Sequence, residues 1–372
     1  MFVTILIFVA ILGLLVFVHE LGHFIVAKKS GMKVDEFGFG FPPRVIGIQK
    51  IDGKFKLVWG HRGALDSAHT VYSINLIPLG GFVKIVGENN EGESDPQSFI
   101  NKPFGRRLLT LLAGVFMNVI LAWVLLSIGL GIGLPAAVDG SSSLPKGARL
   151  SEQSAAILEV RKDSPAEKAD LKIGDVIVSI NGQETKTSGE VQKFVSEHKG
   201  QQLSFVIKRG QQNENKSVEA LANPPENEGP TGIVLADVGK LSYPWYLAPW
   251  AGAQATVLQL GGIVSGLYHL IASGVGFDSL GGPVKIAQLT GQVADLGILY
   301  LLQFAAFLSL NLAILNVLPF PALDGGRVLF LFIEKIRGKR NNQKIEQWAN
   351  TAGFALLLLL MLAVTVKDIR GL

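Results

Sequence analysis

The sequence predicts a polytopic α-helical membrane protein with about four transmembrane helices, a membrane-associated β-hairpin or sheet region and one extracytoplasmic α+β domain. Hydrophobic residues make up 48% of the 372 residues. The mean hydropathy is +0.37, above what a soluble globular protein needs. Apolar segments cover residues 1–27, 108–134, 298–318 and 355–366. A span needs roughly 20 apolar residues, so these four segments are the predicted spans.

Basic residues give these spans an orientation. They cluster after the first span, before the second, and between the third and fourth. All three clusters fall on one side if the N-terminus is outside and the spans alternate, so that side is predicted to be cytoplasmic. Both termini and the segment after the second span are then extracytoplasmic, although Lys367 and Arg370 run against the rule. The net charge of +4 is therefore an orientation signal, and no nucleic-acid partner is predicted.

The first span carries ionisable groups that are costly inside a membrane. His19 and His23 are four residues apart, so one helix face presents both imidazoles. This is the spacing of two zinc ligands, with Glu20 beside them as the base that deprotonates water at the metal. The HExxH pattern also arises by chance on soluble helices. Within an apolar span the cost of burial makes a functional site the stronger interpretation.

A third ligand has to come from the cytoplasmic end of another span, at the same depth. The chain has no cysteine, so the ligand is histidine or a carboxylate. The third span ends in residues 316–327, where two prolines and two glycines break the helix. Asp324 is a carboxylate at the predicted depth. It could also cap a helix that begins at Gly325, and both roles can hold because they need different lone pairs.

HELGH at 19–23 and NVLPFPALDGG at 316–326 resemble the site-2 protease family of intramembrane zinc metalloproteases. The resemblance is to the bacterial regulator of sigma-E protease type with a single PDZ domain, and it covers nearly the whole chain. It implies that His19, His23 and Asp324 bind zinc, that Glu20 is the general base, and that Asn316 helps to hold substrate or the oxyanion. It also implies a multi-pass protein of the bacterial inner membrane with its active site near the cytoplasmic side.

The same resemblance implies a class of substrate. Members of this branch cleave single-span membrane proteins that another protease has already trimmed, such as anti-sigma factors, and also signal-peptide remnants. Residues 78–84, Pro-Leu-Gly-Gly-Phe-Val-Lys, resemble the β-hairpin of the family. An exposed strand edge near a metal can pair with an extended substrate. We therefore predict that Gly80, Gly81, Phe82 and Val83 bind substrate, the alternative being a cytosolic cap without a catalytic role.

In the second span, residues 114–122 place small residues and Asn118 at helical spacing. Small residues let helices approach closely, and an asparagine can form hydrogen bonds between them. That structural role alone explains the pattern. Asn118 also matches a recurring asparagine of the family, which implies a part in substrate binding, although Val115 stands where the family usually has proline.

After a linker at 140–145, a soluble module extends to about residue 236. Residues 163–175, DSPAEKADLKIGD, resemble the PDZ domain of bacterial proteases, with Asp170 in place of the usual glycine at a turn that aspartate tolerates. PDZ domains bind extended chain ends by strand addition. The resemblance therefore implies that peptide ends or substrate ectodomains bind here.

Aromatic residues mark the segment that follows this module. Trp245, Tyr246 and Trp250 favour the membrane interface. We predict a helix that lies on the outer leaflet or is partly re-entrant, and not a fifth span. The predicted parts are thus a first span (1–33), the β region (34–100), a second span (101–139), the PDZ domain with its linker (140–240), the interfacial segment (241–297), a third span (298–327), and a cytoplasmic helix with the fourth span (328–372).

The function predicted from these features is intramembrane cleavage of transmembrane segments by a zinc endopeptidase. The alternative is a catalytically silent membrane adaptor that recruits partners through its PDZ domain. The presence of Glu20 argues against the adaptor, because a protein without activity has no need of the base. A transporter is a third possibility, but no inverted repeat is visible.

Overall fold

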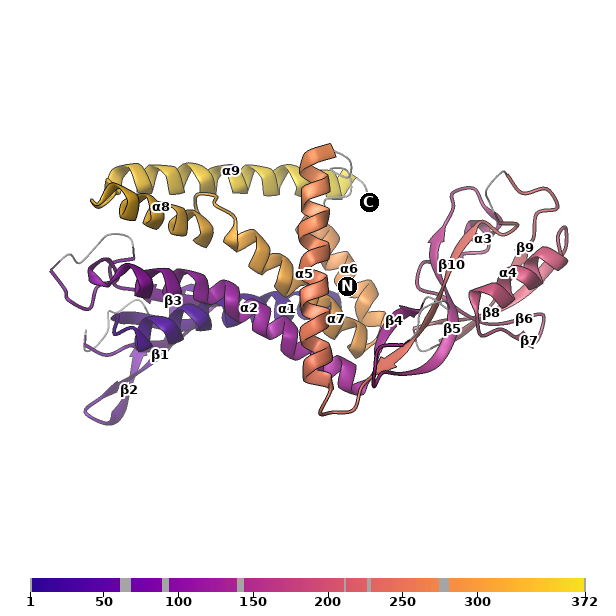
Figure 1. Ribbon diagram of the computed structural model, residues 1–372, viewed down its shortest axis with the longest axis horizontal. Coiled ribbons are helices and arrows are strands. Elements are labelled where there is room, and N and C mark those ends of the chain that lie inside the picture. Colours follow the sequence, from indigo (N-terminus) through magenta and orange to yellow (C-terminus); the bar gives the residue numbers. More distant parts are fainter. Residues whose placement is uncertain are drawn as a thin grey trace. The chain divides into compact units, whose positions relative to one another are not determined.

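The computed structural model describes residues 2–60, 68–88, 94–138, 144–210, 212–225, 229–273 and 281–370 (Figure 1). Most of the predicted linker at 140–145 lies outside these residues. The chain divides into two compact units. The first holds residues up to 125, 254–291 and 304–372, and the second holds residues 126–253 and 292–303.

Five helices of the described residues are long and apolar enough to cross a membrane. Four of them match the predicted spans: α1 (Phe2–Lys29), α2 (Phe104–Ile132), α7 (Ile298–Val317) and α9 (Gln343–Arg370). The fifth is α5 (Ala248–Ser273), in the segment predicted to be interfacial. The helices support the predicted class of polytopic membrane protein. The predicted number of four is not confirmed, because length and composition do not show which helices cross. The shorter helices are the 3₁₀ turn η1 (Phe99–Asn101), α6 (Pro283–Leu296) and α8 (Asp324–Arg337).

A small antiparallel sheet of three strands lies in the first unit: β1 (Val34–Ile51), β2 (Lys54–Trp59) and β3 (Val71–Ile85), in the order β2-β1-β3. The first half of β1 is paired on both sides by β3, because residues 71–74 and residues 81–85 both pair with residues 34–39. β3 therefore passes around the end of β1. Among the described residues, 81–85 pair with no other strand, so their outer side is an open sheet edge.

The sheet is attached to α1 through aromatic side chains. The ring of Phe37 on β1 stacks on Phe24 with centroids 4.5 Å apart and lies 5.5 Å from Phe17. Phe17 and Phe24 are two helical turns apart and share one face of α1. Glu20, three residues after Phe17 and four before Phe24, lies beside that face. The packing brings the open edge of β3 to the polar end of α1.

Helix α6 lies at the end of the first unit where α1 begins and α9 ends. The carboxylate of Asp368, in the last turn of α9, accepts the backbone N–H groups of Gly282 and Lys285 at 2.9 and 3.0 Å. Further along α6, Gly291 contacts Thr4 in the first turn of α1.

The second unit is built on one sheet with the order β4-β10-β5-β6-β8-β9, and the short β7 pairs with β6. Its core is formed by buried side chains of β5, β6 and β8, among them Ile157, Ile177 and Phe205, each no more than 1% exposed. Two short helices, α3 and α4, contact this sheet, and the unit also includes the end of α2, the start of α5 and residues 292–303. Its elements are β4 (Leu134–Val138), β5 (Arg149–Val160), α3 (Pro165–Lys168), β6 (Val176–Ile180), β7 (Gln183–Glu184), α4 (Ser188–Glu197), β8 (Gln202–Arg209), β9 (Gln212–Glu219) and β10 (Ile233–Ser242).

Asp170 adopts the conformation that the sequence predicted for it. Its φ is +56°, the left-handed region where glycine is most often found. Its carboxylate contacts Lys216 at 2.9 Å, Lys172 at 3.2 Å and Arg209 at 3.3 Å. Hydrogen bonds from these three cations hold the pKa of Asp170 well below its usual range. The substitution of glycine thus adds an ionic tie between this turn and the β8–β9 hairpin.

Candidate metal site and active-site cavity

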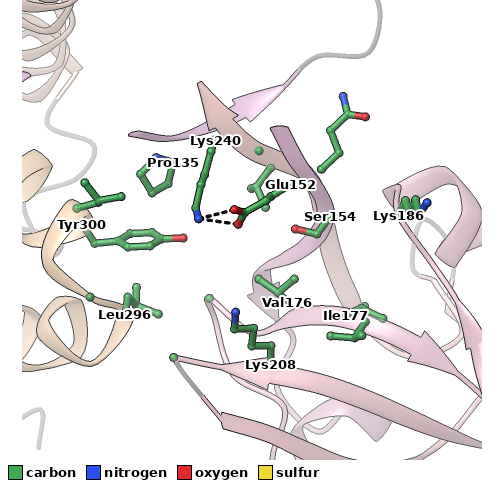
Figure 2. Close-up of a pocket in the computed structure, with 18 of the residues that line it drawn as sticks. Pro135, Glu152, Ser154, Val176, Ile177, Lys186, Lys208, Lys240, Leu296 and Tyr300 are labelled. Atoms are coloured by element: carbon green, nitrogen blue, oxygen red, sulfur yellow. Dashed lines mark hydrogen bonds and ion pairs between the residues drawn. The ribbon is translucent and has the colours of Figure 1, made fainter. Parts of the chain in front are cut away.

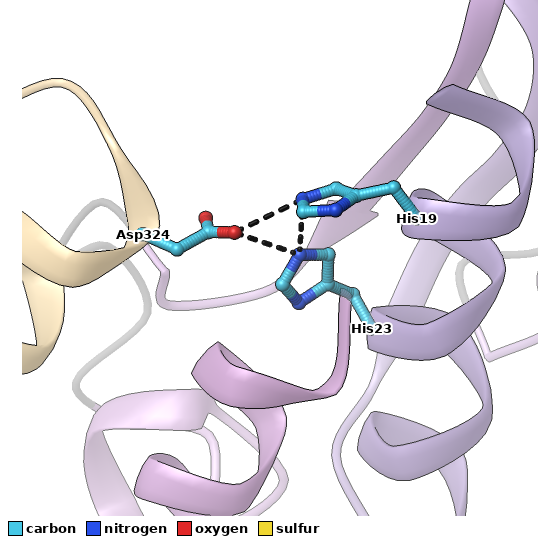
Figure 3. Close-up of side chains that lie close together, drawn as sticks. All are labelled: His19, His23 and Asp324. Atoms are coloured by element: carbon cyan, nitrogen blue, oxygen red, sulfur yellow. Dashed lines mark hydrogen bonds and ion pairs between the residues drawn. The ribbon is translucent and has the colours of Figure 1, made fainter. Parts of the chain in front are cut away.

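Three potential metal ligands from two distant segments meet in the first unit (Figure 3). His19 Nε2 lies 3.0 Å from Asp324 Oδ2 and 3.2 Å from His23 Nε2. His23 Nε2 lies 3.4 Å from the same carboxylate oxygen. Both imidazoles are buried. It is the only group of three metal-ligating side chains found among the described residues.

Local sequence explains how each ligand reaches the site. His19 and His23 are one helical turn apart on α1, so their rings share a face. Asp324 is the first residue of α8, after the proline-containing break that follows α7. The N-cap of α8 is Leu323, and no side chain caps this helix end. The carboxylate of Asp324 therefore faces the imidazoles, and the capping role is not seen.

The surroundings of His23 fit a metal. Its Nδ1 donates to the backbone carbonyl of Thr110 at 2.7 Å. This bond fixes the tautomer in which Nε2 carries the lone pair. That nitrogen faces the other two donor atoms, and a cation between them offsets the repulsion of two lone pairs and a carboxylate.

The surroundings of His19 fit a metal as well. Its Nδ1 lies 3.2 Å from the amide of Asn118, whose Oδ1 has no hydrogen-bond partner among the described residues. An amide can be turned by 180° without moving its heavy-atom positions. In the turned orientation Oδ1 accepts from Nδ1–H, the number of hydrogen bonds is unchanged, and Nε2 of His19 is left as a ligand. The backbone carbonyl of Asn118 accepts from Ser309 Oγ at 2.8 Å, which ties α2 to α7.

The two histidines occupy space that only glycine leaves on α2. A Cβ on Gly114 would lie 2.4 Å from His23 Nε2 and 2.7 Å from His19 Nε2. On α1, a Cβ on Gly22 would lie 2.4 Å from the carbonyl oxygen of Ala113. The helices therefore cross at the glycine of the HELGH motif, as the small residues of the second span predicted. The crossing places the two histidines of the candidate metal site against the backbone of α2.

A cavity of about 450 Å³ opens beside the ligands. It is lined by Glu20, His23 and Asp324 and by the open edge of β3. Glu20 lies directly against this edge, since a Cβ on Gly81 would lie 3.0 Å from the Cβ of Glu20. Glu20, which is not one of the three candidate ligands, therefore lies in the cavity next to the free strand edge.

The predicted substrate-binding residues separate into two groups. Gly81, Phe82 and Val83 line the cavity. Gly80 does not, and it packs against Val16 of α1 with a φ of +99°. Asn118 also lies outside the lining, fully buried against the ring of His19.

Asn316, in the last turn of α7, is half-buried and is not among the residues that line the cavity.

Among the cavity residues that sequence reasoning missed are Arg327 and Glu88, which form an ion pair. Arg327 lies one helical turn after Asp324, and its Nη1 donates to Oε1 of Glu88, just beyond β3. The spacing of Arg327 from Asp324 is a signal, because residues three apart on a helix share a face. Nothing in the sequence points to Glu88 as its partner.

A second cavity of about 530 Å³ lies within the second unit (Figure 2). Lys240 and Glu152 form an ion pair across it, with Nζ 2.7 Å from Oε1. Figure 2 shows Tyr300 and Leu296 on the opposite side from Ser154. The described residues contain no metal-ligating group here, so the cavity of the first unit is the candidate active site.

Two histidines one turn apart, a carboxylate from another segment and an adjacent glutamate define a metallopeptidase site set in membrane-type helices. The model of the family described as Peptidase family M50 matches residues 7–360. The regulator of sigma-W protease RasP of Bacillus subtilis is 32% identical over 454 residues, covering 99% of each chain. The zinc metalloprotease RasP of Geobacillus kaustophilus is 31% identical, covering 99% of this chain and 98% of its own. The PDZ domain of an SdrC-like protein from Listeria innocua is 30% identical and covers 22% of this chain and 92% of its own, with a TM-score of 0.20.

The chain therefore belongs to peptidase family M50, the site-2 protease family. It is a metalloprotease, and its function is intramembrane proteolysis. Both statements agree with the sequence predictions.

Proposed function

We propose that this protein is a zinc endopeptidase that cuts peptide bonds within transmembrane segments, with zinc held by His19, His23 and Asp324. The observation that carries the proposal is the meeting of these three donor atoms, all within 4.8 Å of one another, beside a cavity with a free strand edge. Zinc bound at such a site polarises a carbonyl oxygen and lowers the pKa of water to about 7. The metalloprotease names of the relatives support the choice of metal.

Glu20 is the proton carrier in this proposal. It accepts the proton of the attacking water and delivers it to the leaving amine. The backbone of Gly81 holds its stem in place. Thr110 and Asn118 orient the two imidazoles, so we assign Asn118 to ligand positioning in addition to the predicted substrate role. Purified protein in liposomes should cleave a model transmembrane peptide and stop when a chelator is added. A peptide left intact by zinc-loaded protein would reject the proposal.

The proposed substrates are single-span membrane proteins already trimmed by another protease. A relative is named as a regulator of sigma-W protease, which supports an anti-sigma factor as one substrate. We further propose that the second unit is a PDZ domain that receives extended chain ends. Residues 233–236 of β10 pair with β5 but not with β4, whose pairing begins at Asp237. This edge lies near α4, where the Asp237 carboxylate accepts the N–H of Ser188, and it suits strand addition.

At the active site, we propose that substrate is added as a strand to the edge formed by residues 81–85. The N–H of Val86 donates to the Lys33 carbonyl, on the β1 side, at 3.0 Å. Because alternate residues of a strand point their N–H groups the same way, those of Lys84 and Phe82 also face β1. The N–H groups of Ile85, Val83 and Gly81 then face the cavity. They can replace hydrogen bonds that a substrate helix loses on unwinding, each of which costs several kcal/mol in lipid.

Val83→Pro should slow cleavage of stable helical substrates most, because it removes an N–H that faces the cavity and leaves the bonds to β1 intact. A substrate softened by glycine or proline near the cut bond should recover part of the loss, since less unwinding then falls to the enzyme. Val83→Ala is the matched control, because it shortens the same side chain and keeps the N–H. Equal rates for Val83→Pro and Val83→Ala on both substrates, with zinc content intact, would reject strand addition.

We propose that α5 does not cross the membrane, although it is long and apolar enough. Its start lies at the C-terminal end of α2, where Gly252 packs against Ser127. Its end is followed by α6, which Asp368 holds at the C-terminal end of α9. In the predicted topology both places are extracytoplasmic, so α5 begins and ends on one side. The protein then lies in the bacterial inner membrane, with the second unit and both termini on the extracytoplasmic side.

Labelling of single introduced cysteines tests this topology without background, because the chain has no cysteine of its own. A membrane-impermeant maleimide should label Ser273→Cys, at the end of α5, and Gly200→Cys, in the second unit, on intact spheroplasts. Lys339→Cys, between α8 and α9, should be labelled only after permeabilisation. The reverse pattern at Ser273 would make α5 a span.

A further inference from the structure

We propose that Arg327 is a substrate-binding residue, which donates hydrogen bonds to main-chain carbonyls of the bound peptide strand while Glu88 holds it in place. The inference rests on the proposed cleavage of peptides bound at the edge of β3. Arg327 and Asp324 both line the active-site cavity, one helical turn apart on α8. A donor on Arg327 is thus set on the same wall as a metal ligand.

Glu88 is a fixed support for the guanidinium. The turn after β3 is held by backbone bonds from Val86 to Lys33 at 3.0 Å and from Phe99 to Val86 at 2.8 Å. The N–H of Glu88 itself donates to the Ile85 carbonyl at 3.3 Å. The position of Arg327 therefore depends, through Glu88, on the position of the strand edge. The ion pair joins the edge that would bind substrate to the helix that carries Asp324.

The guanidinium retains unused donors. Its side chain is 29% exposed, and one N–H of Nη1 bonds to Glu88. Within the described residues, which omit 89–93, no second hydrogen bond to Arg327 is found. An arginine has five N–H donors, so the remaining ones are available to a ligand in the cavity. Hydrogen bonds to a charged group contribute more than neutral ones, so a carbonyl acceptor in the cavity would gain from these donors.

A second arginine that contacts α8 is bound differently from Arg327. Arg107 of α2 binds Glu334 of α8 through both Nη atoms, at 2.7 and 3.1 Å. Both prongs of that fork are occupied, so Arg107 fastens the two helices together. The bond found for Arg327 among the described residues uses Nη1 alone, and the residue lines the cavity.

A substrate strand added to the edge of β3 would have backbone carbonyls without hydrogen-bond donors, and Arg327 can supply such donors. Pairing with the edge of β3 satisfies the backbone groups of alternate substrate residues only, and the others point away from the sheet. In a membrane those carbonyls have no water to bind, and each unsatisfied group costs several kcal/mol. The far wall of the cavity includes Asp324, which cannot donate when ionised, and Arg327, which can. Arg327 is the charged donor of that wall.

Arg327→Lys separates substrate binding from a structural role. Lysine keeps the charge and can still pair with Glu88, but it has no planar fork for a second acceptor. We expect kcat/KM for a synthetic single-span peptide to fall roughly 10- to 100-fold, mainly through KM, with zinc content and thermal stability unchanged. Arg107→Lys is the control, and it should change stability without raising KM.

Peptides with single backbone esters locate the contact. Each ester weakens one carbonyl as an acceptor and removes the N–H of the same linkage, and the scan leaves the cut bond itself unchanged. One ester position should slow the wild type and have little further effect on Arg327→Lys, because the same bond is already lost. An Arg327→Lys enzyme within twofold of wild type, or one that loses zinc or unfolds, would overturn the inference. So would ester effects that add fully to Arg327→Lys at every position. If the wild type cleaves the peptide and this cleavage depends on Glu20, the proposed function holds whatever Arg327→Lys does. If the wild type does not cleave, both proposals are rejected.

Discussion

Replacing Glu20 by glutamine should leave a protein that binds zinc and does not cut. Glutamine has nearly the same volume, so it can keep the contact with the backbone of Gly81. It cannot take a proton from water. Loss of a general base typically lowers the rate about 10²- to 10⁴-fold. Zinc should stay, because the ligand group consists of His19, His23 and Asp324 and does not include Glu20.

Single-turnover cleavage of a model transmembrane peptide, together with metal analysis of the same sample, measures this outcome. Asp35→Asn is the matched control. Asp35 lines the same cavity and pairs with Lys84 at 3.3 Å. It is therefore a nearby carboxylate to which no proton transfer is assigned. Its substitution should change the rate much less. Near-normal cleavage by zinc-loaded Glu20→Gln would mean that another group is the base.

Gly114→Ala should remove most of the metal affinity, although residue 114 is no ligand. The new Cβ would lie 2.4 Å from His23 Nε2 and 2.7 Å from His19 Nε2, closer than real Cβ contacts come. Either the rings or α2 must move. Loss of the contacts that orient metal ligands typically costs roughly 10- to 100-fold in metal affinity, and we expect at least that loss here. Cleavage should fall with the zinc content.

Competition with a chelator compares the zinc affinities of the variants. Gly105→Ala is the matched control on the same helix, because apart from the adjoining helix backbone nothing lies within 4 Å of the position its Cβ would take. It should bind zinc as the wild type does. If Gly114→Ala had the same zinc affinity as Gly105→Ala, the two imidazoles could not be the ligands in the arrangement described.

The meeting of the three candidate metal ligands could be predicted from the sequence because its signals are local. His19 and His23 share a helix face by spacing alone. Asp324 follows from membrane depth, since charge clusters orient the spans and place the end of the third beside the end of the first. These constraints need no knowledge of how the helices pack.

The residues that orient the ligands depend on packing, which spacing does not give. The small residues of the second span predict a close approach of helices. They do not tell which carbonyl or amide meets which ring. Thr110 and Asn118 reach His23 and His19 only because α1 and α2 cross at Gly22. The pairing of Arg327 with Glu88 joins residues 239 positions apart and is likewise a property of the fold.

The β region shows the same limit. The alternation of apolar and polar residues predicts strands, and the glycine and proline residues near 78–81 predict a turn or an interruption of the strand. The strand pattern gives no sign that β3 pairs with both sides of β1, which is what leaves residues 81–85 as an open edge. Register and pairing are tertiary properties, set by how the sheet packs on α1.

The count of bound zinc in purified wild type and Asp324→Ala tests the central claim, that His19, His23 and Asp324 form one metal site. We predict one zinc per wild-type chain. With Asp324 removed, two imidazoles remain, and the zinc should be lost on dialysis against a mild chelator that leaves the wild type loaded. Zinc retained by Asp324→Ala at the wild-type stoichiometry would contradict the account.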